Sequence, residues 1–213
     1  MNTLSLSEID LIRYFPAISD YQQELLVQFA QEIIFWNSQI NLISRNDISH
    51  LWERHLFHSL AIHHFATFED GTTAIDVGTG GGFPGIPLAI MNPNVHFTLL
   101  DSIGKKINTL TKIAASLKLD NVTTIQERIE NHNLKYDYVV GRAVTDLNLF
   151  YADVKHCIAR RSDKKVSGAG IWYLRGPDIV SPKKIAAKIF PLNQLYPQIF
   201  FETKLLVYIP TYI

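Results

Sequence analysis

Hydrophobic positions in the first part of the chain recur with the spacing of a helix. An amphipathic helix is predicted over about residues 19–40, with Ser19 or Asp20 as its N-cap. The apolar stripe behind this prediction is Tyr21, Leu25, Phe29 and Ile33. A second helical stretch is predicted at about residues 50–65, and Asp70-Gly71 then breaks the pattern. Residues 1–70 are therefore expected to form a helical appendage.

From Thr72 onwards, short apolar runs rich in β-branched residues alternate with turns and helical stretches. This alternation is typical of βα units, so it predicts an α/β fold with parallel strands covered on both faces. The predicted strands are Thr73–Val77, His96–Leu100, Val122–Gln126, Asp137–Val140, Ile171–Leu174 and Lys204–Ile209. The predicted helices are Ile86–Met91, Lys105–Leu117 and Asp146–Cys157. Residues 71–213 are therefore expected to form a second, Rossmann-like unit, which packs with the first into one compact domain.

Composition narrows the function classes. The 213 residues have zero formal net charge, so any nucleic-acid binding must come from local basic patches. Cys157 is the single cysteine, which excludes an intramolecular disulfide and favours a reducing compartment. The first ten residues do not resemble a signal peptide, and no run of about 20 apolar residues occurs. We expect a cytoplasmic protein that does not span a membrane.

A glycine-rich turn separates the strand Thr73–Val77 from the helix that follows it. Such a turn lets the backbone approach a ligand closely and directs helix N–H groups at it. The dinucleotide fingerprint needs a third glycine where this chain has Phe83, and the Gly-Lys-Ser or Gly-Lys-Thr of a phosphate loop is missing. A ligand without a pyrophosphate is therefore favoured. The alternative is an ordinary flexible turn.

Asp101 ends the next predicted strand, 23 positions after Gly78. A carboxylate there can accept hydrogen bonds from both hydroxyls of a ribose, although alone it would equally suit a helix N-cap. Asp76 is placed to hold a cationic amino group or to brace the turn, and Gly78 and Gly80 leave room for a bulky sulfonium ligand. S-adenosylmethionine has all of these parts, so it is the predicted cofactor.

These residues resemble one family closely, the bacterial small-subunit ribosomal RNA guanine-N7 methyltransferases, also called glucose-inhibited division protein B. The resemblance covers most of the chain and implies a class I methyltransferase fold. Its most specific parts are Gly82–Pro87 (Gly-Phe-Pro-Gly-Ile-Pro) and Asp101–Lys106 (Asp-Ser-Ile-Gly-Lys-Lys). Further resembling segments are Asn41–Arg45, Glu53–His55, Asp76–Gly78 and Gly141–Ala143.

The resemblance also implies site residues. The cofactor contacts would be Gly78, Phe83, Asp101, Ile129, Glu130 and Arg142, and the basic residues facing RNA would be Lys105, Arg128, Arg142 and Arg175. Two residues depart from the family pattern. His58 stands where many members have aspartate, and Arg175 stands where lysine is usual, which keeps the charge but changes the donor geometry.

The implied reaction is an in-line displacement by guanine N7, whose lone pair is already free. It needs no strong base, no metal and no covalent intermediate, and it depends on positioning. Arg142 is the candidate catalytic residue, expected to reach O6 or a phosphate because a donor on N7 would block the nucleophile; the alternative is a salt bridge at a strand end. Phe83 would contact the cofactor, stack on a flipped base, or pack under the loop.

The remaining candidate residues indicate no specific site. The basic stretch of residues 160–165 would grip phosphates or form a solvated loop, and five histidines between His50 and His64 match no zinc motif. The expected partner is small-subunit rRNA or the ribosomal subunit, bound by a monomer. The alternatives are a methyltransferase of the same fold with another substrate, and a non-catalytic RNA-binding or assembly module. A nicotinamide dehydrogenase is disfavoured by Phe83.

Overall fold

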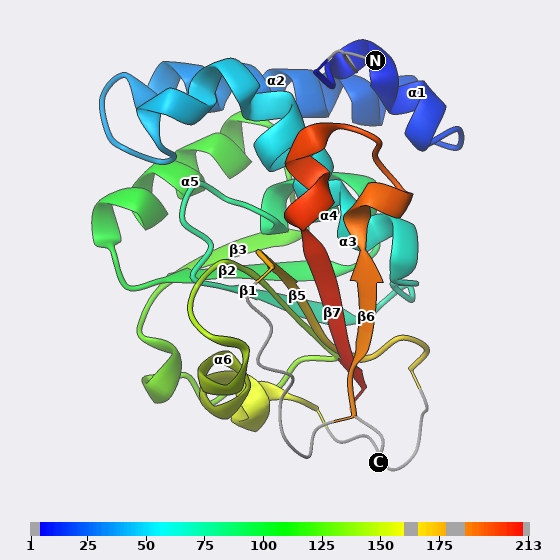
Figure 1. Ribbon diagram of the computed structural model, residues 1–213. Helices are drawn as coiled ribbons and strands as arrows, with labels where there is room; N and C mark the ends of the chain where they lie inside the picture. The colour runs from blue at the N-terminus through cyan, green and yellow to red at the C-terminus, as the bar shows by residue number, and fades with distance from the viewer. Residues whose placement is uncertain (1–4, 160–165, 178–185, 211–213) are drawn as a thin grey trace.

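Figure 1 shows the computed structural model, which describes residues 5–159, 166–177 and 186–210. At its centre is a seven-stranded sheet in the order β3-β2-β1-β4-β5-β7-β6. Neighbouring strands are parallel except that β7 is antiparallel to both β5 and β6. The strands are β1 Thr73–Val77, β2 His96–Asp101, β3 Val122–Gln126, β4 Tyr138–Arg142, β5 Gly170–Arg175, β6 Lys188–Pro191 and β7 Leu205–Pro210. The predicted Rossmann-like α/β class is therefore confirmed.

Side chains along each central strand alternate between two hydrophobic clusters, one on each face of the sheet. In β4, Tyr138 and Val140 belong to the larger cluster, whereas Val139 belongs to the smaller one. This period of two is what a strand buried on both faces requires. Helices cover both faces (Figure 1), with α6 on the opposite face from α3, α4 and α5. Their bounds are α3 His58–Phe65, α4 Gly85–Met91, α5 Gly104–Ser116 and α6 Leu147–Val154.

The N-terminal helices form an outer layer over α4 and α5 (Figure 1). The long helix α2, Asp20–Asn37, begins at the predicted N-cap: the Ser19 hydroxyl accepts from Gln22 N, and the Gln22 side chain accepts from Ser19 N. Its buried face includes Phe29, which belongs to the same cluster as the sheet residues Tyr138 and Leu206. The elements around it are η1 Glu8–Asp10, α1 Leu11–Tyr14, η2 Arg45–His50 and the π-helical turn η3 Trp52–Phe57.

Most predicted bounds differ from the structure by at most a few residues, and those of β1 and β3 are identical. The sequence did not predict η1, α1 or the edge strand β6. The remaining short turns are η4 Ile129–Asn131, η5 Lys155–Cys157, η6 Leu192–Gln194 and η7 Ile199–Thr203. Among the described residues, no helix is both long and apolar enough to cross a lipid bilayer.

The strand order reverses at β1, because β2 and β3 lie to one side of it and β4 and β5 to the other. In open α/β sheets such a reversal leaves a crevice at the carboxyl ends of the strands, and ligands bind there. The glycine loop leaves β1 at this edge, and Asp101 and Arg142 end β2 and β4 at the same edge.

Candidate active site

The turn after β1 is shaped by glycines in the left-handed region. Gly78 has φ +69° and Gly80 has φ +58°, which side chains adopt only with strain. A Cβ on Gly78 would come within 3.0 Å of Val144 Cγ2, whereas the nearest atom to a Cβ on Gly80 lies 3.9 Å away. The backbone N–H groups of Gly78 and Thr79 both donate to the carbonyl of Leu100 in β2. The turn is thus fastened to the neighbouring strand and open beside Gly80.

Asp76 braces this turn from inside the protein. Its side chain is fully buried, and Oδ2 accepts from Thr79 Oγ1 at 2.6 Å and from Gly85 N at 2.8 Å. The other oxygen, Oδ1, is buried and has no hydrogen-bond partner among the described residues. Burial raises the pKa of Asp76 to about 6, against the opposing effect of these hydrogen bonds. One acceptor atom of the site therefore has unused capacity.

Asp101 links the glycine turn to the start of α5. Its Oδ2 accepts from Gly80 N at 3.0 Å, and its Oδ1 accepts from Ile103 N at 2.9 Å. Each carboxylate oxygen has a second lone pair, so both can still accept from a ligand hydroxyl. The two roles considered for Asp101, a cap near the start of a helix and a ribose acceptor, are therefore compatible in this geometry.

Phe83 packs beneath the loop. It is only 2% exposed, and its ring lies 5.1 Å from that of Phe29 and 5.2 Å from that of His55, centroid to centroid. The guanidinium carbon of Arg142 lies 5.1 Å from the ring centroid. Of the roles considered for this side chain, packing under the loop is the one that the structure shows, and the ring is not placed to stack on a base.

Arg142 is held by a helix that precedes the sheet in the chain. Its Nη1 donates to the carbonyl of Arg54 at 3.2 Å, and its Nη2 donates to His55 Nδ1 at 2.9 Å. Burial, reinforced by the charge of Arg142, lowers the pKa of His55 to about 3. His55 is therefore neutral at physiological pH and presents a lone pair to the arginine. Burial lowers the pKa of Arg142 to about 10, which leaves it charged.

Asp47 contacts the two residues that hold Arg142, which are Arg54 and His55. Asp47 Oδ1 accepts from Arg54 Nη1 at 2.8 Å, and Asp47 Oδ2 lies 3.7 Å from His55 Nε2. The sequence reasoning did not predict that Asp47, Arg54 and His55 surround Arg142, because they lie more than 80 residues away in the chain. The only signal was that Glu53–His55 is one of the resembling segments.

The residues expected near an adenine lie directly after β3. Ile129 is half-buried against the smaller hydrophobic cluster, and Glu130 and Arg128 are exposed. This turn is close to the ribose candidate, because Glu127 N donates to the carbonyl of Asp101 at 3.1 Å. The structure thus brings η4 and Asp101 together at the same corner of the crevice.

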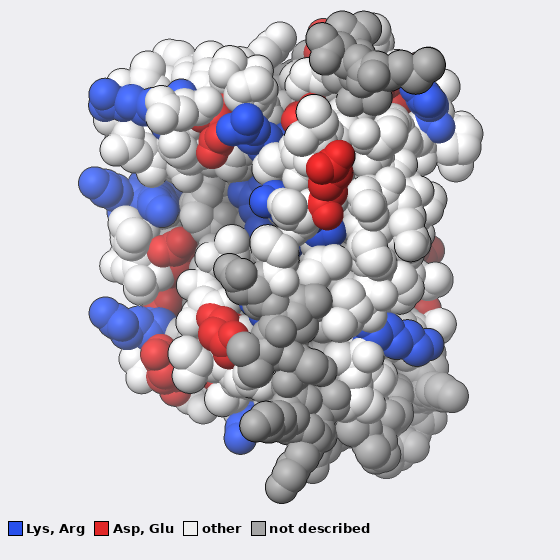
Figure 2. Space-filling view, viewed as in Figure 1, with Lys and Arg blue, Asp and Glu red and all other residues white. Residues whose placement is uncertain are grey.

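The basic candidates are spread along the carboxyl edge. Lys105 is exposed in the first turn of α5, after β2, whereas Arg175 ends β5 on the other side of the glycine turn. Arg175 Nε donates to the carbonyl of Gly176, and its Nη1 is buried without a partner among the described residues. On the face shown in Figure 2, Lys and Arg are distributed among Asp and Glu. The basic stretch 160–165 lies outside the described residues.

His58, which departs from the family pattern, is buried near this group. Its ring contacts those of Phe200 and Phe201 edge-on, and its Nε2 has no hydrogen-bond partner among the described residues. Burial, with a further contribution from Arg142, holds the pKa of His58 well below its usual value. A neutral imidazole therefore occupies the position, without the charge that an aspartate would bring.

In residues 5–159, 166–177 and 186–210 no three His, Cys, Asp or Glu side chains gather as metal ligands.

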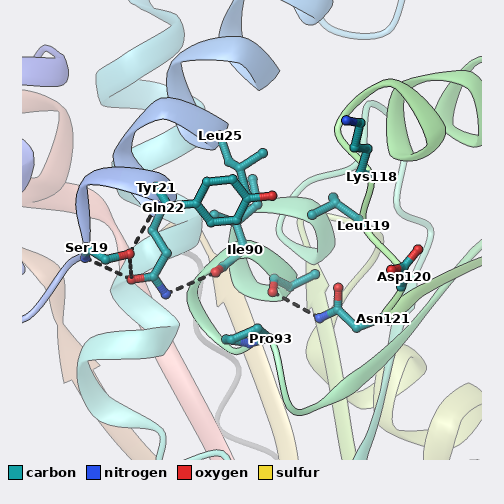
Figure 3. Close-up of a pocket in the computed structure, with 11 residues that line it drawn as sticks. Ser19, Tyr21, Gln22, Leu25, Ile90, Pro93, Lys118, Leu119, Asp120 and Asn121 are labelled. Atoms are coloured by element: carbon teal, nitrogen blue, oxygen red, sulfur yellow. Dashed lines mark hydrogen bonds between the residues drawn. The ribbon is translucent and has the colours of Figure 1, made fainter.

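A separate cavity of about 480 Å³ lies at the opposite edge, between α2, α4 and the turn before β3. Two of the side chains that line it bond backbone of α4 (Figure 3): Gln22 Nε2 donates to the carbonyl of Ile90, and Asn121 Nδ2 donates to that of Ala89. Lys118 and Asp120 stand at its rim. The two hydrogen bonds link α2 and the turn before β3 to α4, so the two amides have a structural role. The cavity is distinct from the site at the carboxyl ends of the strands.

The described residues fit the predicted cofactor. Beside Gly80 there is open space where a side chain would otherwise lie. Asp76 Oδ1 is a buried acceptor without a partner among the described residues, and Asp101 keeps acceptor capacity at the next strand end. S-adenosylmethionine carries both a cationic amino group and a ribose, which are the ligand groups that carboxylates at these two positions suit.

Two solved structures with similar folds are of proteins that depend on or bind S-adenosylmethionine. A SAM-dependent methyltransferase from Aquifex aeolicus superposes with a TM-score of 0.55 at 13% identity, covering 84% of this chain and 97% of that one. TYW2 from M. jannaschii, solved in complex with AdoMet, gives a TM-score of 0.56 at 15% identity, with 80% and 77% covered. At such identities the likeness shows the fold alone, and that fold is the class I methyltransferase fold.

Sequence relatives identify the family. A family model described as rRNA small subunit methyltransferase G matches residues 22–164. The protein named ribosomal RNA small subunit methyltransferase G in Christiangramia forsetii is 44% identical, covering 94% of this chain and 95% of that one. Its namesake in Flavobacterium johnsoniae is 41% identical, with 94% and 97% covered. The chain therefore belongs to the rRNA small subunit methyltransferase G family.

Proposed function

We propose that this enzyme transfers the methyl group of S-adenosylmethionine to N7 of a guanine in small-subunit rRNA. The observation that carries the proposal is the pair of carboxylates at the ends of β1 and β2. Asp76 accepts from the Thr79 hydroxyl and from Gly85 N, Asp101 accepts from Gly80 N, and both carboxylates keep lone pairs for a ligand. Family membership supports the class of substrate.

The glycine turn and the residues around it have separate roles toward the cofactor. Gly78 and Gly80 allow close approach of the backbone, Asp101 accepts from the ribose hydroxyls, and Asp76 Oδ1 faces the cationic amino group. Ile129 and Glu130 form the side of the pocket near the adenine. S-adenosylmethionine, when bound, supplies an electrophilic methyl group to guanine N7.

Arg142 orients the guanine from the other side of the turn. Two of its five N–H donors are already used by Arg54 and His55, which fix the direction of the guanidinium. The remaining donors suit guanine O6 or a phosphate and leave the lone pair of N7 free to react. No described residue has to remove a proton from N7, so the contribution of Arg142 is positioning and charge.

The RNA lies along the carboxyl edge of the sheet in this proposal. Lys105, Arg128 and Arg175 contact phosphates on both sides of the glycine turn, so binding weakens as salt is raised. The enzyme acts in the cytoplasm as a monomer on naked small-subunit rRNA or on the ribosomal subunit.

The first test is transfer of labelled methyl from S-adenosylmethionine to unmodified small-subunit rRNA, naked and within the subunit. We expect label in 7-methylguanosine, and Asp101→Ala should reduce the rate at limiting cofactor at least about tenfold, since it removes charge-assisted hydrogen bonds. The matched control is Asp120→Ala, which removes an exposed acidic side chain at the opposite edge of the sheet.

The outcomes separate cofactor from substrate. If S-adenosylmethionine binds to the wild type but no label enters either RNA substrate, the RNA assignment is wrong and the cofactor site stands. If Asp101→Ala and Asp120→Ala bind the cofactor equally well, the proposed role of Asp101 is wrong.

A further inference from the structure

The turn that follows Arg142 has an unusual backbone conformation. Ala143 has φ +49°, in the left-handed region that residues with a Cβ rarely adopt. Such a conformation persists only where the surroundings hold it, and it is found most often at functional sites. Here Ala143 N donates to the carbonyl of Leu174 in β5 at 3.0 Å. We call residues 143–146 the post-arginine turn.

The post-arginine turn places an apolar side chain against the glycine turn. Val144 Cγ2 lies 3.0 Å from the position that a Cβ on Gly78 would take, yet Val144 as a whole is 44% exposed. It therefore lies between β1 and β4, where the strand order reverses and the crevice opens. A side chain at this place borders both the cofactor beside Gly78 and the base that Arg142 orients.

A hydroxyl from the neighbouring strand fixes the post-arginine turn. Tyr173 Oη donates to the carbonyl of Thr145 at 2.6 Å and accepts from Thr145 N at 3.0 Å. The ring of Tyr173 is fully buried and stacks on Phe150, with centroids 4.2 Å apart. Phe150 packs in the same cluster without a hydroxyl, so the core does not need one at Tyr173. The hydroxyl serves the exposed turn.

We propose that Tyr173 is a positioning residue, which acts through the post-arginine turn to hold Val144 as a fixed apolar wall beside the reacting groups. The inference rests on the proposed function and adds a residue to it. With both Thr145 backbone groups bonded to one buried hydroxyl, the wall cannot move without breaking two hydrogen bonds. Restricting the guanine in this way keeps N7 in line with the methyl group, and small displacements from that line slow such reactions strongly.

Tyr173→Phe tests this, because it keeps the buried ring and removes only the hydroxyl. We expect kcat for RNA methylation to fall about tenfold, while the Kd for S-adenosylmethionine changes less than about twofold, since the cofactor is held by the other turn. Thr145 is exposed, so water can replace the lost partner and the fold is retained. Val144→Ala should reproduce the loss of kcat, because it removes the wall itself.

Tyr138→Phe is the matched control. Tyr138 is equally buried on the adjacent strand β4, and its hydroxyl bonds backbone in the same way, with Glu69 N, Thr67 O and Ser167 O each at 3.0 Å. It does so at the opposite edge of the sheet, so its loss should leave kcat unchanged.

Three results would contradict the inference. The first is a Tyr173→Phe enzyme with the kcat of the wild type. The second is an equal fall of kcat in Tyr173→Phe and Tyr138→Phe, which would indicate general loosening. The third is a Val144→Ala enzyme with unaltered kcat. A wild-type enzyme that binds S-adenosylmethionine but methylates no RNA would instead overturn the proposed function, which this inference requires.

Discussion

Asp76 and Asp101 lie near the carboxyl ends of the adjacent strands β1 and β2, but their carboxylates have different surroundings. Both oxygens of Asp101 accept from backbone N–H groups, whereas Oδ1 of the fully buried Asp76 has no partner among the described residues. A buried carboxylate with an unused acceptor is unfavourable in its charged form, which is why burial raises the pKa of Asp76 to about 6. Its charge lowers stability, and we propose that it is retained for a ligand.

Asp76→Asn should show this through pH. The folded-state pKa lies above the unfolded value of 3.8, so the folded protein holds this proton more tightly and the free energy of unfolding falls as pH rises from about 4 to about 6. Asparagine keeps an oxygen for Thr79 and Gly85 but carries no charge. The variant should therefore gain stability relative to the wild type across this window, by on the order of 2–3 kcal/mol.

Urea unfolding of both proteins at a series of pH values measures the difference in their free energies of unfolding. The contributions of groups that titrate in both proteins cancel in this difference. Below about pH 4 and above about pH 6 the difference should be constant. Parallel stability curves over the whole range would show that Asp76 is not a buried charge. At neutral pH the variant should also bind S-adenosylmethionine more weakly, because the anionic partner of the amino group is lost.

At this scale, sequence reasoning placed residues correctly relative to one another where their positions follow local spacing. Gly78 and Asp101 were predicted together because consecutive βα units bring the ends of neighbouring strands to one edge. Arg142 was predicted as a site residue, but the sequence did not indicate that His55 and Tyr173 lie near it. Their contacts depend on the packing of distant segments, and a tyrosine in an apolar strand has the same pattern whether or not its hydroxyl is used.

Among the elements, η4 is followed by a histidine that makes two side-chain hydrogen bonds. Glu127 Oε2 lies 2.7 Å from His132 Nδ1, and His132 Nε2 lies 2.9 Å from Tyr136 Oη. A neutral histidine with its proton on Nδ1 donates to the carboxylate and accepts from the tyrosine, which satisfies all three groups. His132 and Tyr136 are both buried, so the C-terminal end of η4 is anchored in the protein interior, and Glu127 is bonded to the same histidine.

His132→Phe should loosen this turn and weaken cofactor binding. Phenylalanine keeps a ring against Tyr136 but removes the histidine that bonds both the Glu127 carboxylate and the Tyr136 hydroxyl. We expect the Kd for S-adenosylmethionine to rise about tenfold, as for a loss of roughly 1.4 kcal/mol, with kcat at saturating cofactor little changed. Isothermal titration calorimetry and saturation kinetics give the two quantities.

His96→Phe is the control for that experiment. His96 makes one hydrogen bond of the same kind, to Thr123 at 2.9 Å, but at the amino end of β2, on the edge away from the site. If both variants raise the Kd equally, the effect is not specific to η4.

Elements with strong periodicity were predicted well, and β6 shows where periodicity fails. Its four residues, Lys188–Pro191, are mostly exposed or half-buried, so the hydrophobic signal of a strand is weak. It is a strand because β7 supplies hydrogen bonds from far along the chain. The helix α2 was predicted because its apolar stripe and capping box are both local.

For the molecule as a whole, we propose that the N-terminal helices and the sheet unfold together. Phe29 in α2 is fully buried in the cluster that also contains the sheet residues, and its ring lies on that of Phe83 beneath the glycine turn. Phe29→Ala should lower the free energy of unfolding by about 3–5 kcal/mol, because it leaves a large cavity.

Tryptophan fluorescence and far-ultraviolet circular dichroism should give one coincident transition for the wild type and for Phe29→Ala. Trp36 and Trp52 report on the N-terminal helices and Trp172 reports on β5. Two separate transitions would show that the N-terminal helices are an independent unit. An exposed apolar residue of the same helix, Ile34, supplies the control, since Ile34→Ala should cost well under about 1 kcal/mol.

The placement of β7 bears on how the enzyme matures during its own translation. β7 lies between β5 and β6 in the sheet but follows both in the chain. While the nascent chain is being made, β5 has an open edge and β6 has no place to dock until residues 205–210 have left the exit tunnel. The parallel half of the sheet can assemble earlier, since domains begin to fold during synthesis. The sheet can therefore close only after β7 is available to pair with both β5 and β6.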